Sequence, residues 1–128
     1  MKKLFVFALS AIILVSFVAC EKDSNIPAPE VVNVTLSDLK IESSMMSFQT
    51  GKTYEFVVTN RGNINHEFMI TPMGGGHQMG MMEISEEGMR PGMMQTRRFT
   101  FSEGGEFEFA CHLPGHYEGG MKFPITVK

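Results

Sequence analysis

The sequence predicts an all-β fold, a small antiparallel β-sandwich with Greek-key connections. From residue 30 onward no segment of the 128-residue chain keeps a helical period, and several short segments alternate with the two-residue period of half-buried strands. Residues that favour turns separate these segments. Seven or so short strands in about 100 residues fit two packed sheets that share one core.

The strands are expected where apolar and polar residues alternate. In chain order these segments are 31–36, 53–59, 66–70, 99–101, 106–111 and 121–127. In the clearest case Phe107, Phe109 and Cys111 share one face, and the glutamates between them share the other. We expect the phenylalanines outside the first twenty residues to supply much of the core.

Residues 72–94 have a different composition. These 23 residues hold six glycines and seven methionines, at positions 73, 79, 81, 82, 89, 93 and 94. We interpret the segment as a long loop, here called the Met-rich flap, in which residues 78–84 could form a short strand. Methionine commonly fills irregular gaps over a core, and that is the simpler interpretation of the flap.

The first nineteen residues predict a secretory signal peptide. Lys2 and Lys3 precede a largely apolar segment, 4–18, which is shorter than the 20 or so residues that a membrane-spanning helix needs. Residues 17–20, Phe-Val-Ala-Cys, resemble a bacterial lipobox, and this resemblance implies that Cys20 is acylated. The alternative is an ordinary cleaved signal with Cys20 as a stray thiol.

The predicted organisation is a signal peptide at 1–19, a tether at 20–30 and one domain at 31–128. It places the protein in a bacterial cell envelope, on the periplasmic side or the outer surface, anchored by lipid. Residues 20–128 carry 9 basic and 14 acidic side chains, a net charge of −5. This mildly acidic balance gives no reason to expect a nucleic acid as partner.

If Cys20 carries lipid, Cys111 is the one remaining thiol in an oxidising compartment. It then has no partner for an internal disulfide, and metal ligation would explain it. Cys111, His116 and Met121 follow one another at a spacing of C-x4-H-x4-M, and His66 lies on the apolar face of an earlier predicted strand. Two imidazoles, one thiolate and a weak thioether form the ligand set of a blue-copper site.

This segment, with residues 51–60 and 65–68, resembles the cupredoxins of the plastocyanin and azurin type over nearly all of 31–128. The resemblance implies one Cu(I)/Cu(II) ion with His66, Cys111 and His116 as strong ligands and Met121 as the axial ligand. It also implies that electrons pass through His116. The chain departs from the family pattern at Phe123-Pro124, because a proline in a strand requires an edge or an unpaired position.

Other assignments of the same residues carry less weight. A catalytic cysteine paired with His112 or His116 lacks an orienting Asn or Asp, so we expect no enzyme. A zinc site would favour a ligand other than Met121. His112, next to Cys111, should point to the opposite side of its strand and lie at the surface.

Two functions remain open. The first is an electron carrier, a monomer that exchanges electrons with redox partner proteins of the cell envelope. The second is a copper-handling protein that binds, stores or delivers copper through the Met-rich flap. For the second function, the candidate ligands of an additional Cu(I) site are His77, Met79, Met81 and Met82.

Overall fold

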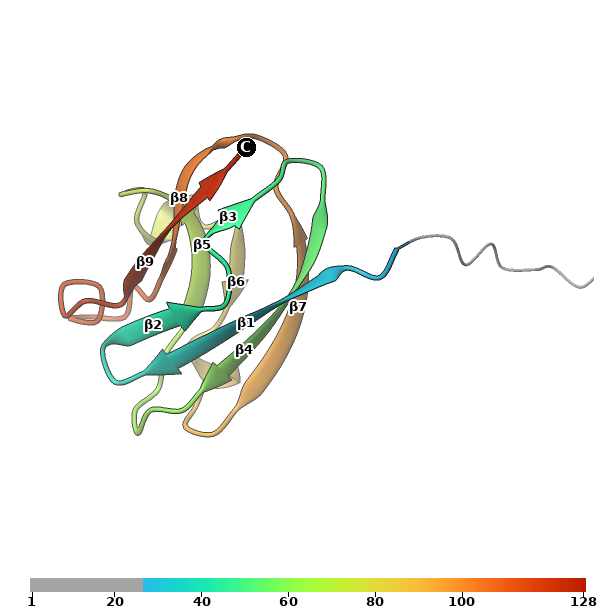
Figure 1. The fold of residues 1–128 in the computed structure, drawn as a ribbon. Coiled ribbons are helices and arrows are strands. Elements are labelled where there is room, and N and C mark those ends of the chain that lie inside the picture. The colour runs from blue at the N-terminus through green and yellow to red at the C-terminus, as the bar shows by residue number, and fades with distance from the viewer. Residues whose placement is uncertain (1–26) are drawn as a thin grey trace, which may run out of the picture.

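The computed structural model describes residues 27–128, which form nine strands in two sheets (Figure 1). The predicted signal peptide at 1–19 and the predicted lipid attachment at Cys20 lie outside the described residues. The strands are β1 (Glu30–Ser37), β2 (Lys40–Ser43), β3 (Ser47–Phe48), β4 (Thr53–Asn60), β5 (Phe68–Pro72), β6 (Met82–Ile84), β7 (Met94–Thr100), β8 (Gly105–Ala110) and β9 (Lys122–Val127).

The two sheets pack as a β-sandwich, which confirms the predicted fold class. One sheet has the strand order β2-β1-β4-β7 and the other the order β3-β9-β8-β5-β6. The sheets are mixed rather than purely antiparallel, because β1 pairs with β4 and β3 pairs with β9 in the parallel sense. Parallel neighbours require a crossover, and here the chain leaves β1 through β2 and β3 before it returns as β4.

Most strands begin and end near the predicted residues, and two were missed. β2 has four residues and β3 has two, which is too short for an alternating pattern to be recognised. The Met-rich flap is a loop that contains one three-residue strand, β6, inside the predicted range 78–84. It also contains two 3₁₀ turns, η1 (His77–Met79) and η2 (Glu86–Gly88).

Aromatic rings fill the space between the sheets, as the phenylalanine content predicted. Phe48 lies at the centre of this cluster and contacts Tyr54, Phe56, Phe101 and Phe109 with ring centroids 5.0 to 5.9 Å apart. All five side chains are at most 2% exposed. Edge-on and tilted ring pairs of this kind add stabilisation to the burial of their area. The cluster forms a rigid base below the end of the sandwich that carries the candidate metal ligands.

Pro124 occupies a position of β9 that needs no hydrogen-bond donor. The N–H groups of Thr126 and Lys128 donate to the carbonyls of Met46 and Phe48, on the side of β9 that faces β3. The two-residue period of a strand places the nitrogen of Pro124 on this same side, before β3 begins. The register Glu108↔Pro124 with β8 is therefore kept, and the proline does not interrupt the sheet.

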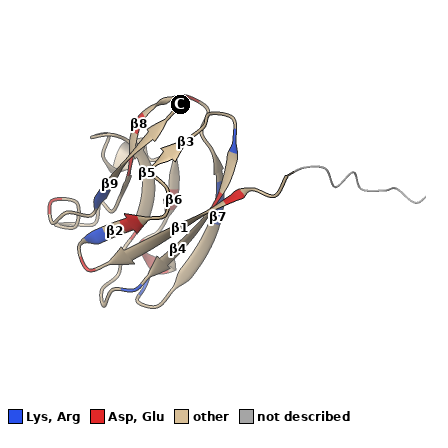
Figure 2. Ribbon diagram, viewed as in Figure 1, with Lys and Arg blue, Asp and Glu red and all other residues tan. Residues whose placement is uncertain are grey.

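Acidic and basic residues are interspersed over both sheets (Figure 2). Two ion pairs between exposed or half-buried side chains join neighbouring strands or strand ends, Arg98–Glu55 at 2.9 Å and Lys52–Glu30 at 2.6 Å. Such pairs contribute at most about 1 kcal/mol each. Within residues 27–128, no helix is long and apolar enough to cross a membrane.

Candidate metal centre

The four residues expected to bind metal come together at one end of the sandwich. His66 lies two residues before β5, and Cys111 immediately follows β8. Because β5 and β8 are antiparallel neighbours, with Met69 opposite Ala110, the start of one strand lies beside the end of the other. His116 and Met121 follow in the loop that connects β8 to β9, here called the ligand loop, 111–121.

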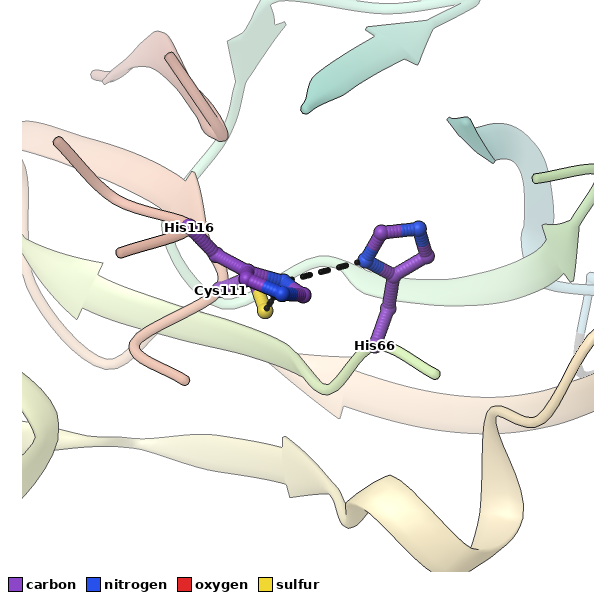
Figure 3. Close-up of side chains that lie close together, drawn as sticks. All are labelled: His66, Cys111 and His116. Carbon is purple, nitrogen blue, oxygen red and sulfur yellow. Dashed lines mark hydrogen bonds between the residues drawn. The ribbon is translucent and has the colours of Figure 1, made fainter. Parts of the chain in front are cut away.

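Three donor atoms point toward one another in this region (Figure 3). The Nδ1 atom of His116 lies 3.3 Å from Nδ1 of His66 and 3.3 Å from Sγ of Cys111. All three donors lie within 4.8 Å of one another. Ligands that surround one first-row transition metal at 2.0–2.3 Å are separated by about 3.5 Å, so the three residues fit a single ion.

Met121, the last residue of the ligand loop, is held next to Cys111 and His116 by backbone hydrogen bonds. Its N–H donates to the carbonyl of His116 at 3.0 Å, and its carbonyl accepts the N–H of Cys111 at 3.1 Å. The Met121 side chain is fully buried and belongs to the same apolar cluster as Cys111. The backbone therefore holds the thioether residue beside both the thiol and the second imidazole.

The thiol of Cys111 is buried and faces a backbone donor. Its Sγ accepts a hydrogen bond from the N–H of Glu67 at 3.4 Å. Burial raises the pKa of Cys111, while the N–H groups of Glu67 and Leu113 act in the opposite direction because they favour the thiolate. A metal ion removes this conflict, since it binds the thiolate and replaces the proton. The sequence did not single out Glu67, because its contact comes from the backbone, which no residue type reveals.

The surroundings of His66 favour its neutral imidazole. Burial lowers its pKa, and the nearby His116 lowers it further, although Asp38 acts in the opposite direction. The neutral form is the one that binds metal ions. The other ring nitrogen, Nε2, is buried and has no hydrogen-bond partner among the described residues.

His116 is the most exposed of the four residues. His66, Cys111 and Met121 are fully buried, whereas His116 is half-buried. It lines an open surface pocket with Leu113 and Pro114 of the same loop. Among the four candidate ligands, His116 is therefore the one that solvent or a partner protein can reach.

The remaining candidates lie outside this group. The ring of His112 stacks on Tyr117 with centroids 4.9 Å apart, and it is half-buried rather than at the surface. Met81 and Met82 are partly buried against the core, and Met79 is 55% exposed. His77 lies in η1, where its ring is close to two glutamates.

Comparison with known proteins identifies the relatives of this chain. The family model described as "Cupredoxin-like domain" matches residues 9–121. A protein of Vibrio cholerae named "Copper-resistant cuproprotein CopI" is 33% identical, over 82% of this chain and 72% of its own length. Proteins with the same name from Rubrivivax gelatinosus and Pseudomonas aeruginosa are 30% and 26% identical over 79% of this chain, and over 68% and 77% of their own lengths.

Solved structures share the same architecture. Auracyanin from Roseiflexus castenholzii superposes with a TM-score of 0.60 at 20% identity, over 79% of this chain and 98% of that chain. Auracyanin A from Chloroflexus aurantiacus, described as a blue copper protein, gives a TM-score of 0.59 at 14% identity. The match covers 79% of this chain and 100% of that chain. The donor set and the family together indicate copper as the metal of the site. On the match to its family model and the sandwich that carries the site, this chain belongs to the family of cupredoxin-like domains.

Proposed function

We propose that this protein holds one copper ion through His66, Cys111, His116 and Met121 and transfers single electrons through it. The observation that carries the proposal is the convergence of three strong donors, of which two are fully buried, on one point. Bound there, copper would supply a one-electron couple between Cu(I) and Cu(II). The residues around it would bind the ion, exclude water and, through the hydrogen bond to the sulfur, adjust the reduction potential of the site.

The chain favours electron transfer because its ligands have little room to move. Cys111 is fixed by the backbone hydrogen bond to Met121 and by the N–H of Glu67 on its sulfur. His66 and Met121 are enclosed by the core. A site whose ligands stay in place requires little reorganisation when the charge of the ion changes, and the hydrogen bond to the sulfur tunes its potential. His116 offers the exposed edge through which a redox partner of the envelope would exchange electrons.

The test is the visible absorption spectrum of the purified protein titrated with Cu(II). We expect an intense thiolate-to-copper charge-transfer band that saturates at one equivalent and disappears in Cys111→Ser. His112→Gln is the matched control, because His112 lies next to the cysteine and outside the donor group; its band should remain. Absence of the band in the unmodified protein, with tight Cu(I) binding, would refute the electron carrier.

A second candidate function is copper handling, favoured by relatives named as copper-resistant cuproproteins. In this role the protein would bind copper and pass it on, with the Met-rich flap as its route. It should then bind more than one Cu(I) and release part of it to a competing chelator. Replacing Met79, Met81 and Met82 together with leucine should abolish this release and leave the reversible couple of the first site intact.

We also propose that the protein is attached to the cell envelope through lipid on Cys20. The support is the sequence of residues 1–20 alone. The intact mass of the protein extracted from membranes should exceed the mass calculated for residues 20–128 by the mass of a lipid group. Cys20→Ala should remove this increment, and an unchanged mass in the unmodified protein would refute the attachment.

A further inference from the structure

A second group of metal-binding side chains lies beside the copper site. Glu67, His77 and Glu83 place one donor atom each within 4.8 Å of one another. They come from three segments: the residue before β5, the 3₁₀ turn η1 and strand β6. Glu83 pairs with Met69 in the β5–β6 register, two residues beyond Glu67, so the sheet itself brings the two carboxylates together.

The carboxylate of Glu67 is buried, and its two oxygens have different partners. Its side chain is 5% exposed. The Oε1 atom accepts the backbone N–H of His112 at 2.6 Å. The Oε2 atom faces Nε2 of His77 at 3.6 Å, which is beyond hydrogen-bond distance. A buried carboxylate normally pairs with a cation, and a metal ion bound between Glu67 and His77 would supply one.

The surroundings offer a further donor and a path from solvent. The His112 ring stands edge-on to the His77 ring, with centroids 6.3 Å apart. Both ring nitrogens of His112 are buried and have no hydrogen-bond partner among the described residues. The side chain of His77 is 55% exposed, so the group is open to solvent, and its chain neighbour Gly76 lines a surface pocket with Gly74 and His112.

We propose that Glu67, His77 and Glu83 form a second metal site, selective for a divalent first-row cation such as Zn(II) or Cu(II). Two carboxylates and one imidazole are hard or intermediate donors, which favour divalent ions over Cu(I). Of the ligands expected for an additional Cu(I) site, this assignment retains His77. Two carboxylates take the place of the three methionine thioethers. Its ligands are separate from those of the copper site, so it does not depend on the proposed electron transfer.

Glu67 connects the two sites physically. Its N–H donates to the sulfur of Cys111, and its carboxylate accepts from the next residue of the ligand loop, His112. A cation bound to the carboxylate adds positive charge next to the donor that faces the sulfur. A divalent ion in the second site should therefore shift the charge-transfer band of the first, a consequence that rests on the proposed function.

The experiment is calorimetric titration of Zn(II) into the protein already loaded with one equivalent of copper. We expect one further equivalent to bind, and His77→Ala and Glu83→Gln each to raise the dissociation constant roughly tenfold or more. Glu103→Gln is the matched control: it removes the same charge from an exposed position of the β7–β8 loop, and Glu103 is not in the group. Its Zn(II) affinity should stay unchanged.

The same titration in the Cys111→Ser variant separates this proposal from the proposed function. If the unmodified protein forms no copper band but Zn(II) binding in Cys111→Ser still depends on His77 and Glu83, the second site stands and the blue-copper site fails. The second site would be overturned if no Zn(II) binds. It would also be overturned if His77→Ala and Glu83→Gln bind Zn(II) as tightly as the control variant. Binding of Cu(I) that requires Met79 and Met82 instead of Glu83 would also overturn it.

Discussion

Asp38 is a single residue that shapes the loop leading to His66. Its Oδ1 accepts the N–H of Asn63 at 2.7 Å, and its Oδ2 accepts the side-chain amide of Asn63 at 3.0 Å. These hydrogen bonds lower the pKa of Asp38 below its ordinary value of 3.8. Ionised Asp38 thus holds residues 61–65, which connect β4 to His66, in one conformation.

Asp38→Ala should lower the stability of the fold in a pH-dependent way. Because the pKa is lowered in the folded state, the stabilisation is complete above the ordinary pKa of 3.8 and is lost as the pH falls through the lowered value. The difference in melting temperature between the two proteins should therefore be largest near neutral pH and shrink as the pH falls below 3.8. Thermal denaturation followed by circular dichroism over this range measures it. A difference that grows toward acidic pH would contradict the assignment.

At the scale of elements, the ligand loop depends on close backbone packing. A side chain at Gly119 would lie 2.9 Å from the carbonyl oxygen of Gly115 and 3.0 Å from Leu39, inside ordinary contact distance. The same carbonyl accepts the N–H of Gly119 at 3.0 Å. Gly115 itself has a φ of 81° but no atom within 4 Å of an added Cβ. One glycine is thus required by space and the other by backbone angle.

This contrast predicts different outcomes for two equal substitutions. Gly119→Ala should force the ligand loop apart, weaken copper binding and shift the charge-transfer band. Gly115→Ala should cost about 1–2 kcal/mol of unfolding free energy through strain and leave the band in place. Copper titration and urea denaturation of both variants provide the measurement. An unchanged band in Gly119→Ala would show that the loop tolerates the added atom.

The aromatic core supports the strand that ends in Cys111. Phe109 of β8 is fully buried and lies two residues before the cysteine. Phe109→Ala should lower the unfolding free energy by about 3–5 kcal/mol, because it removes a ring and leaves a cavity. Met94→Ala is the control, because the Met94 side chain is 63% exposed. It should change the unfolding free energy by less than about 0.5 kcal/mol. Equal effects in urea denaturation would contradict the described core.

At the scale of the whole molecule, the copper site joins segments that are far apart in sequence. His66 and Cys111 are separated by the whole flap and the four strands β5 to β8, and they meet only when β5 and β8 pair. An ion that binds all of them stabilises the folded state alone, because the unfolded chain does not hold the ligands together. Metal binding is thereby linked to the stability of the entire sandwich.

Copper should raise the melting temperature of the protein. A ligand at a free concentration 1,000 times its dissociation constant stabilises the folded state by about 4 kcal/mol. Scanning calorimetry with and without copper measures the shift. Cys111→Ser should show a much smaller shift, since the thiolate is lost. If the variant gained as much stability from copper as the unmodified protein, the ion would be bound elsewhere.

The sequence by itself determined the fold class, the principal strands and the ligand loop. Alternation of two residues in 106–111 follows directly from the geometry of a strand with one buried face. Cys111, His116 and Met121 lie within eleven consecutive residues, so local chain geometry was enough to group them. The strand pairing of β2 and β3 could not be predicted, because their few residues obtain their conformation from their neighbours.

Only the tertiary structure decided which distant groups share a site. It brought His66 to Cys111, supplied the N–H of Glu67 to the sulfur and placed His77 beside two glutamates. A residue pattern reports the face on which a side chain lies, whereas contacts across a sheet depend on register and on the path of the flap. Backbone donors carry no residue identity at all, and so the environment of the copper sulfur could be found only in the folded chain.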